Sequence, residues 1–308
     1  MSNALAELRQ LSTIVADSGD LASIARLKPV DATTNPSLIL KAARSDSAEV
    51  QEWLQQTRAM AVSAAQKRYS LGARFASRIQ QDVERWVSLE ADATLSFDTS
   101  GTIACADQLL EAVVHHGGDP QRILIKVAAT WEGIRAAQVL ESRGIKTNLT
   151  LIFNISQAQL CAAGGIHLIS PFVGRISDWY KAQGHSVTEA DDDPGVLSVR
   201  RIQAWVKQHG YATLVMGASF RSVEQVLALA GCDLLTVAPD LLDSLSERTG
   251  GVEAAIGRLP AHQDWPAVPH ESEFRMGLAE DAMAGEKLLE GIRRFAADQR
   301  SLDELLAA

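Results

Sequence analysis

Lys126 interrupts an apolar run, Arg122-Ile-Leu-Ile-Lys-Val-Ala-Ala-Thr130, in which four of the nine residues are β-branched. Such a run is typical of a strand that is covered on both faces. Burial disfavours the charged form of an amine, and a neutral amine is the nucleophile that forms an imine (Schiff base) with a carbonyl substrate. A lysine in an apolar run more often extends its amine to solvent or pairs with a carboxylate. This run alone therefore does not show whether Lys126 forms an imine or is a solvated or ion-paired lysine.

Other polar residues stand near the ends of further apolar runs. They are Asp17, Thr33, Thr34, Asn35, Glu90, Asp92, Asn148, Thr150, Ser170, Arg175, Ser219 and Arg221. Taken singly, several have a structural interpretation: Asp17 and Asn35 as turn residues, Glu90 as a surface charge, and Arg175 as a partner of Asp178. Taken together, a carboxylate, an amine, amides, hydroxyls and arginines indicate a reaction site, provided that the strand ends meet.

Eight runs rich in β-formers alternate with amphipathic helical segments. The predicted strands are Ser12–Ala16, Pro29–Ala32, Val87–Leu95, Ile123–Ala129, Thr147–Phe153, His167–Val173, Thr213–Gly217 and Leu234–Ala238. The predicted helices include Ala48–Tyr69, Ile103–His115, Trp131–Ser142, Ser156–Ala163, Gly195–His209 and Ser222–Leu229. This alternation predicts an α/β fold, a parallel (β/α)8 TIM barrel, in which the carboxyl ends of all strands converge. The rival, a doubly wound open sheet, lacks a G-x-G-x-x-G after the first strand.

The domain prediction is one barrel domain over residues 1–308. It carries a helical insertion at about 36–86 and a C-terminal helix at about 280–299, which could close over an opening. A proline-rich loop, LPAHQDWPAVPHESEF, precedes that helix. A length of 308 residues suits a barrel with insertions.

The composition restricts the class of partner and the compartment. Nine net negative charges argue against nucleic acid or an anionic membrane as a general partner. No apolar run reaches the length of a membrane span and the amino terminus has no secretion pattern, so we expect a cytoplasmic protein. Cys105, Cys161 and Cys232 have no C-x-x-C spacing, which favours buried reduced thiols.

One acidic run could suggest a calcium site. Glu189-Ala-Asp-Asp-Asp-Pro-Gly195 lacks the alternate ligands, central glycine and closing glutamate of an EF-hand loop. We interpret Asp193, directly before Pro194, as the N-cap of the following helix.

Several segments, in this order, resemble transaldolase of the pentose phosphate pathway. They are IVADSGD, DATTNPSLIL, RILIKVAATWEGIRAAQVLESRGI, NLTLIF, LISPFVGRISDWY, VMGASFR and GCDLLTVAP, within a similarity that runs from about Leu5 to Leu306. The resemblance implies a (β/α)8 barrel, a Schiff-base mechanism without metal or cofactor, sugar phosphates as substrates and commonly a homodimer.

The same resemblance assigns roles residue by residue. Lys126 is the imine-forming lysine, Asp17 the carboxylate that acts on the C4 hydroxyl, and Glu90 with Thr150 holds a catalytic water. The residues that bind the sugar carbons and the phosphate are Thr33, Asn35, Asn148, Ser170, Phe172, Arg175, Ser219 and Arg221.

The sequence departs from the family pattern at three places outside this set. Val83-Glu84-Arg85-Trp86 and Ala91-Asp92-Ala93-Thr94 stand in place of the common VPGR and VDAR, and Met276-Gly277-Leu278-Ala279 stands where tryptophan and polar residues are more usual.

Three alternative functions remain open. One is a Schiff-base aldolase that releases dihydroxyacetone, or a phosphosugar isomerase that uses Lys126 as a base. Another is a metal-dependent aldolase, which no histidine cluster supports. The last is a phosphosugar-binding barrel without catalysis.

Overall fold

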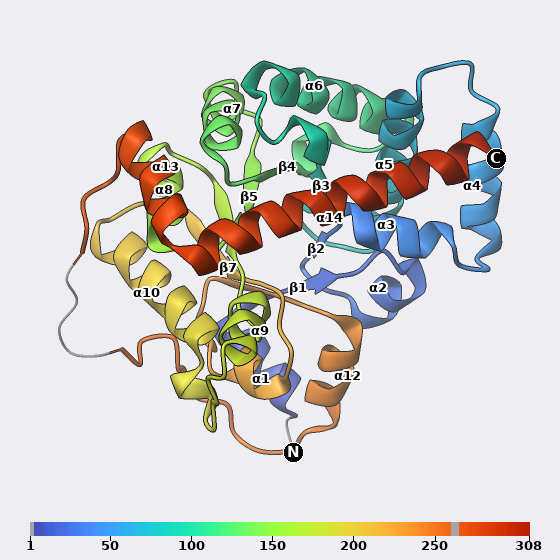
Figure 1. The fold of residues 1–308 in the computed structure, drawn as a ribbon. Helices are drawn as coiled ribbons and strands as arrows, with labels where there is room; N and C mark the ends of the chain where they lie inside the picture. The colour runs from blue at the N-terminus through green and yellow to red at the C-terminus, as the bar shows by residue number, and fades with distance from the viewer. Residues whose placement is uncertain (1–2, 260–264) are drawn as a thin grey trace.

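Eight parallel strands form a closed barrel with the strand order of the sequence (Figure 1). The structure is a computed structural model that describes residues 3–259 and 265–308. The strands are β1 (Thr13–Asp17), β2 (Asp31–Thr33), β3 (Val87–Glu90), β4 (Ile123–Ala128), β5 (Thr147–Ile152), β6 (Leu168–Pro171), β7 (Leu214–Gly217) and β8 (Leu234–Val237). The predicted TIM barrel is therefore confirmed, and all eight strands lie within or close to the predicted runs.

Helices surround the barrel and alternate with its strands. They are α1 (Ala4–Leu11), α2 (Leu21–Leu27), α3 (Pro36–Ala43), α4 (Ala48–Arg58), α5 (Ala64–Ile79), α6 (Thr99–His115), α7 (Trp131–Ser142), α8 (Ile155–Ala163), α9 (Gly174–Ala182), α10 (Pro194–Gln208), α11 (Val223–Leu227), α12 (Pro239–Glu247), α13 (Glu271–Glu280) and α14 (Ala282–Ala307). Short 3-10 turns lie at η1 (Ala93–Leu95), η2 (Pro120–Arg122) and η3 (Ala190–Asp192). Within the described residues, no helix is both long and apolar enough to cross a membrane.

Three local predictions were wrong in their boundaries. The predicted helix Ala48–Tyr69 is two helices, because Ser63 forms a capping box with Gln66 and starts α5 anew. The predicted third strand ends at Glu90 instead of Leu95, since the Asp92 side chain accepts a hydrogen bond from the Thr94 amide and caps η1. The ESEF end of the predicted loop belongs to α13, and residues 260–264 of that loop lie outside the described residues.

Other local predictions hold. Asp193 caps α10 by accepting hydrogen bonds from the amides of Gly195 and Val196, α6 ends at His115, and the three cysteines are buried and free. The acidic run around Asp193 is used in ion pairs, since Asp191 binds Arg200 and Arg258.

The long helix α14 crosses the barrel on the side where the chain leaves the strands (Figure 1). Its Gln299 side chain accepts a hydrogen bond from the Ala93 amide just after β3. Asp303 forms an ion pair with Arg68 of α5, and Arg68 also binds Asp92. The predicted C-terminal helix is thus confirmed, extends to Ala307, and is fixed to the loop that follows Glu90.

The side chains inside the barrel stack in layers, each contributed by alternate strands, as the strand tilt requires. Following the observed registers round the barrel gives the members of four layers. From the carboxyl end downward they are Asp17, Glu90, Thr150 and Ala218; then Thr33, Lys126, Ser170 and Thr236; then Val15, Ser88, Asn148 and Met216; and then Asp31, Leu124, Leu168 and Leu234. The two upper layers contain carboxyl, amine and hydroxyl side chains.

Candidate active site

A cavity of about 210 Å³ opens at the carboxyl ends of the strands. Its lining residues are Asp17, Thr33, Asn35, Lys126, Thr150, Ser170, Phe172, Arg175, Met216, Ala218, Ser219, Phe220, Arg221, Thr236, Ala238 and Phe295. Ten of the twelve residues expected to form the site are in this set. The other two do not line the cavity, but Glu90 contacts Lys126 and Asn148 contacts Ser170. Residues that are far apart in the sequence therefore line one space.

Lys126 lies within the barrel and is 5% exposed. Its Nζ atom donates a hydrogen bond to the backbone oxygen of Thr34 at 3.2 Å and lies 3.3 Å from Oε2 of Glu90. In the parallel register, Lys126 pairs with Glu90 on β3 and with Asn148 on β5. The amine is thus held toward the cavity by one neutral acceptor and one carboxylate.

The two carboxyl groups beside Lys126 share a poorly hydrated environment. Loss of hydration raises the pKa of Asp17 above its usual value, and the charges of Lys126 and Arg175 oppose that rise. Burial raises the pKa of Glu90 in the same way, against the same two cations. When burial raises the pKa of a carboxyl group, the group binds a proton more readily. Such a group is suited to accept a proton and return it during a reaction.

Asn148 is fixed by hydrogen bonds on both sides of its amide. Its Nδ2 donates to Oγ of Ser88 at 2.9 Å, and Oγ of Ser170 donates to its Oδ1 at 2.6 Å. Sequence reasoning did not include Ser88. The alternation of Ser88 with Glu90 in VSLE was the available signal, because both side chains must face the barrel interior.

Asn35 has a structural role in addition to its place in the cavity. Its side chain caps α3 by accepting a hydrogen bond from the Leu38 amide at 2.9 Å, with Pro36 in the first helical turn. Its turn-residue interpretation is therefore correct as well, and the cap fixes the direction of the side chain at the cavity wall.

The far end of the cavity is cationic. The Arg175 guanidinium lies over the rings of Phe172 and Phe295, 4.9 and 5.5 Å from their centroids. Burial lowers the pKa of Arg175, as do the positive charges of Arg294 and Arg221. Several cations with aromatic backing suit an anionic group such as a phosphate.

Arg221 stands beside Ser219 at this end. Its Nη1 lies 3.3 Å from Oγ of Ser219, and its Nη2 pairs with Asp178 at 2.8 Å. Asp178 is thus the partner of Arg221, and the alternative in which it pairs with Arg175 is wrong. Ser219 has a φ of 65°, a left-handed conformation that is costly for a residue with a Cβ atom.

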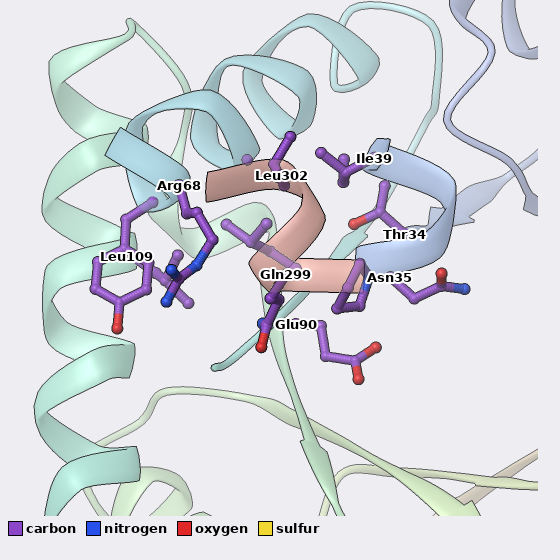
Figure 2. Close-up of a pocket in the computed structure, with 12 residues that line it drawn as sticks. Thr34, Asn35, Ile39, Arg68, Glu90, Leu109, Gln299 and Leu302 are labelled. Carbon is purple, nitrogen blue, oxygen red and sulfur yellow. The ribbon is translucent and has the colours of Figure 1, made fainter. Parts of the chain in front are cut away.

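A second cavity of about 40 Å³ lies behind Glu90 (Figure 2). Arg68 of α5, Gln299 of α14 and Asn35 line it from different elements. Figure 2 shows Glu90 and Gln299 among the residues that line it, with Gln299 on the segment of α14 that passes by. The helix therefore closes one side of Glu90 as well as contributing Phe295 to the larger cavity.

Sequence reasoning also missed Thr236, Met216, Ala218, Phe220, Ala238 and Phe295 among the cavity residues. Most are apolar, so only their place on a strand end or on the covering helix could have indicated them. Within the described part of the chain, no group of three or more His, Cys, Asp or Glu side chains is placed to hold a metal ion.

Comparison with known proteins agrees with this geometry. The family model described as Transaldolase/Fructose-6-phosphate aldolase matches residues 14–306. The chain belongs to this family. A transaldolase of Alteromonas mediterranea is 49% identical over 316 residues, which cover 99% of this chain and 98% of that protein. Transaldolases of Aliivibrio salmonicida and Vibrio cholerae are each 47% identical and cover all of this chain and 99% of their own. Similarity of this extent makes the chain an enzyme of the transaldolase type.

Proposed function

We propose that the chain transfers a dihydroxyacetone unit between sugar phosphates in the pentose phosphate pathway, through an imine on Lys126. The donor is sedoheptulose 7-phosphate or fructose 6-phosphate, and the acceptor is glyceraldehyde 3-phosphate or erythrose 4-phosphate. One observation carries the proposal: a buried amine 3.3 Å from a carboxylate shares a cavity with the guanidinium groups of Arg175 and Arg221.

Imine formation is the first step. The Lys126 nitrogen attacks the C2 carbonyl carbon of the donor, and the carbonyl oxygen takes up a proton to give a carbinolamine. Loss of that oxygen as water leaves a protonated imine. Glu90 and Thr150, with a water, carry the protons of this step, in keeping with the position of Glu90 beside Nζ.

Cleavage follows at the C3–C4 bond. Asp17 removes the proton of the C4 hydroxyl, the C4 oxygen forms the new carbonyl, and the electron pair of the C3–C4 bond moves into the imine. An aldose phosphate leaves, and the three-carbon unit stays on Lys126 as an enamine. The acceptor aldehyde then reacts in the reverse sense, and water releases the new ketose phosphate.

Retention of the enamine distinguishes transfer from simple cleavage. Thr33, Asn35, Ser170 and Phe172 line the cavity and hold the three-carbon unit, together with Asn148, which is hydrogen-bonded to Ser170. Ser219, Arg175 and Arg221 bind the phosphate. Holding the unit in place keeps water from protonating it before the acceptor arrives. The hydrogen bonds that join Ser88, Asn148 and Ser170 support this role, because they fix the direction of the Asn148 amide.

We further propose that residues 1–308 act as one barrel domain in the cytoplasm, as a homodimer that binds sugar phosphates and neither nucleic acid nor membrane. The net charge of −9 supports the exclusion of polyanionic partners. Size-exclusion chromatography with light scattering tests the dimer.

Borohydride reduction tests the chemistry. The enzyme is incubated with fructose 6-phosphate, reduced, digested and mapped by peptide mass spectrometry. We expect a three-carbon adduct on the peptide that contains Lys126, and product formation that depends strongly on an aldehyde acceptor. An adduct on another lysine would contradict the assignment. Release of dihydroxyacetone at the same rate without an acceptor would favour the aldolase alternative.

A further inference from the structure

Three buried threonine hydroxyls line the main cavity without a partner among the described residues. They are Oγ1 of Thr33, Thr150 and Thr236. A buried hydroxyl that forms no hydrogen bond costs on the order of 1–3 kcal/mol, so such a group indicates a ligand or water that completes it. Thr33 and Thr150 already have proposed roles. Thr236 has none.

Thr236 is built into β8 as an inward-facing residue and is 4% exposed. Its neighbours Leu235 and Val237 pack in the outer core between barrel and helices, so the strand alternation directs residue 236 to the interior. In the parallel register, it pairs with Val15 on β1. The hydroxyl therefore belongs to the cavity and cannot reach the solvent outside the barrel.

The layers of the barrel interior give Thr236 a specific place. It shares a layer with Thr33, Lys126 and Ser170, which come from β2, β4 and β6. In an eight-stranded barrel, β8 lies opposite β4 across the axis, so Thr236 faces Lys126 at the same height. In the proposed function, Lys126 binds the three-carbon unit covalently, and Thr33 and Ser170 hold it. A group bound to the Lys126 nitrogen lies in the cavity that all four of these residues line.

We propose that Thr236 is a further substrate-binding residue, whose hydroxyl forms a hydrogen bond with the retained three-carbon unit on the side opposite Lys126. The inference rests on the proposed function. It makes the layer of Thr33, Lys126, Ser170 and Thr236 a ring around the enamine, with Asp17 in the layer above it. Loss of the hydroxyl loosens the enamine, so the unit is released more often before an acceptor arrives.

The test compares Thr236→Val, which removes the hydroxyl at nearly constant volume, with Thr236→Ser, which keeps it. Thr57→Val is the matched control: Thr57 of α4 is fully buried, its hydroxyl also lacks a partner, and it lies outside the cavity. Fructose 6-phosphate and erythrose 4-phosphate are supplied, and sedoheptulose 7-phosphate and free dihydroxyacetone are both measured.

We expect T236V to lower kcat/KM for transfer about tenfold, as the loss of one or two hydrogen bonds would. It should also raise the ratio of released dihydroxyacetone to transferred product severalfold. T236S should recover most of both quantities, and T57V should match the wild type in both. A merely structural role would not change the ratio of release to transfer.

Two results would overturn the inference: T236V with the wild-type rate and ratio, or T236S as impaired as T236V, which would assign the effect to packing. Both leave the proposed function intact. A wild-type enzyme that neither transfers the unit nor forms a reducible adduct contradicts the proposed function itself, and the inference that rests on it.

Discussion

The two ends of the barrel interior use polar groups in opposite ways. In the two lower layers, the polar side chains bind other protein groups: Asp31 accepts hydrogen bonds from the Arg85 side chain and the Trp86 amide, and Asn148 lies between two serines. In the two upper layers, Thr33, Thr150 and Thr236 have unpartnered hydroxyls. The polar side chains of the lower layers are thus satisfied by the protein itself, whereas several of those in the upper layers are not.

This difference separates stability from function within one fold. Val15, Leu124, Leu168, Met216 and Leu234 form an apolar cluster in the lower layers, against which Trp86 packs. Interiors of this kind are close-packed, and a well-packed apolar layer stabilises the barrel without making chemistry possible. Unpartnered hydroxyls and poorly hydrated carboxylates are destabilising, so their concentration at one end is most simply explained by substrate binding.

The largest difference in turnover is expected between substitutions of two lysines, one at each end of the barrel interior. Lys126→Met should lower turnover on the order of 10⁴-fold or more, because no imine can form, while circular dichroism shows an unchanged fold. The matched control is Lys146→Met. Lys146 lies over the Trp86 ring at the lower end, 4.4 Å from its centroid, and its loss should leave turnover within about twofold. Near-wild-type turnover by purified Lys126→Met would refute the role of this lysine.

Two aspartates provide the next comparison. Asp17→Asn should lower turnover about 10²- to 10⁴-fold, since the C4 hydroxyl loses its general base. Borohydride trapping of the imine should be much less affected. Asp31→Asn weakens the contacts to Arg85 and Trp86 and should cost about 1–3 kcal/mol of stability with unchanged kcat. If Asp17→Asn reduced imine formation and cleavage equally in single-turnover assays, its role as the C4 base would be wrong.

How much the sequence alone could predict also differs between the two ends. Apolar runs such as ILIKV and LLTVA predicted the barrel because strands covered on both faces have few alternatives. The charged and amide residues of the upper end were identifiable, since they interrupt such runs. Thr236 was not, because a threonine in a strand looks like an ordinary β-former. Ser88 was indicated only by its alternation with Glu90 in VSLE.

The ends of some helices and strands were predicted wrongly, because they depend on hydrogen bonds that the pattern of apolar and polar residues does not indicate. The break between α4 and α5 contains neither glycine nor proline, and it depends on the Ser63–Gln66 capping box. The early end of β3 depends on Asp92, which binds Thr94 and the distant Arg68. The position of α14 over the barrel likewise depends on residues more than 200 positions away in the sequence, such as Arg68 and Ala93.

A cavity-forming substitution in the lower end should affect stability alone. Leu234→Ala removes a side chain that is 2% exposed within the apolar cluster and should cost about 2–5 kcal/mol in the free energy of unfolding. At a temperature well below its lowered Tm, the variant should keep its kcat and KM for fructose 6-phosphate within about twofold. Denaturant titration and steady-state kinetics on one preparation measure both quantities. A tenfold fall in kcat would show that the two ends are coupled.

A smaller effect is expected at the cationic end of the cavity. Arg175→Gln should raise KM for fructose 6-phosphate about 10- to 100-fold, because a guanidinium that lies between two aromatic rings no longer binds the phosphate. The rate with unphosphorylated fructose at equal concentration should change much less. Arg85→Gln, at the opposite end, is the charge-matched control and should leave KM unchanged. Equal losses with both sugars would mean that Arg175 acts on packing instead of on the phosphate.

The smallest expected effect is on the pH dependence of stability. Loss of hydration raises the pKa of Asp17 in the folded protein above the usual value of 3.8. Its contribution to stability is therefore fully present below about pH 3.8 and declines as pH rises through the higher folded pKa. Asp17→Asn has no such group, so its advantage over the wild type in the free energy of unfolding should be small near pH 4 and grow toward pH 7. Leu234→Ala removes no titratable group, and its cost should be the same at both values. Urea unfolding at each pH measures this, and an Asp17→Asn variant less stable than the wild type at pH 7 would show that the carboxylate stabilises the upper end.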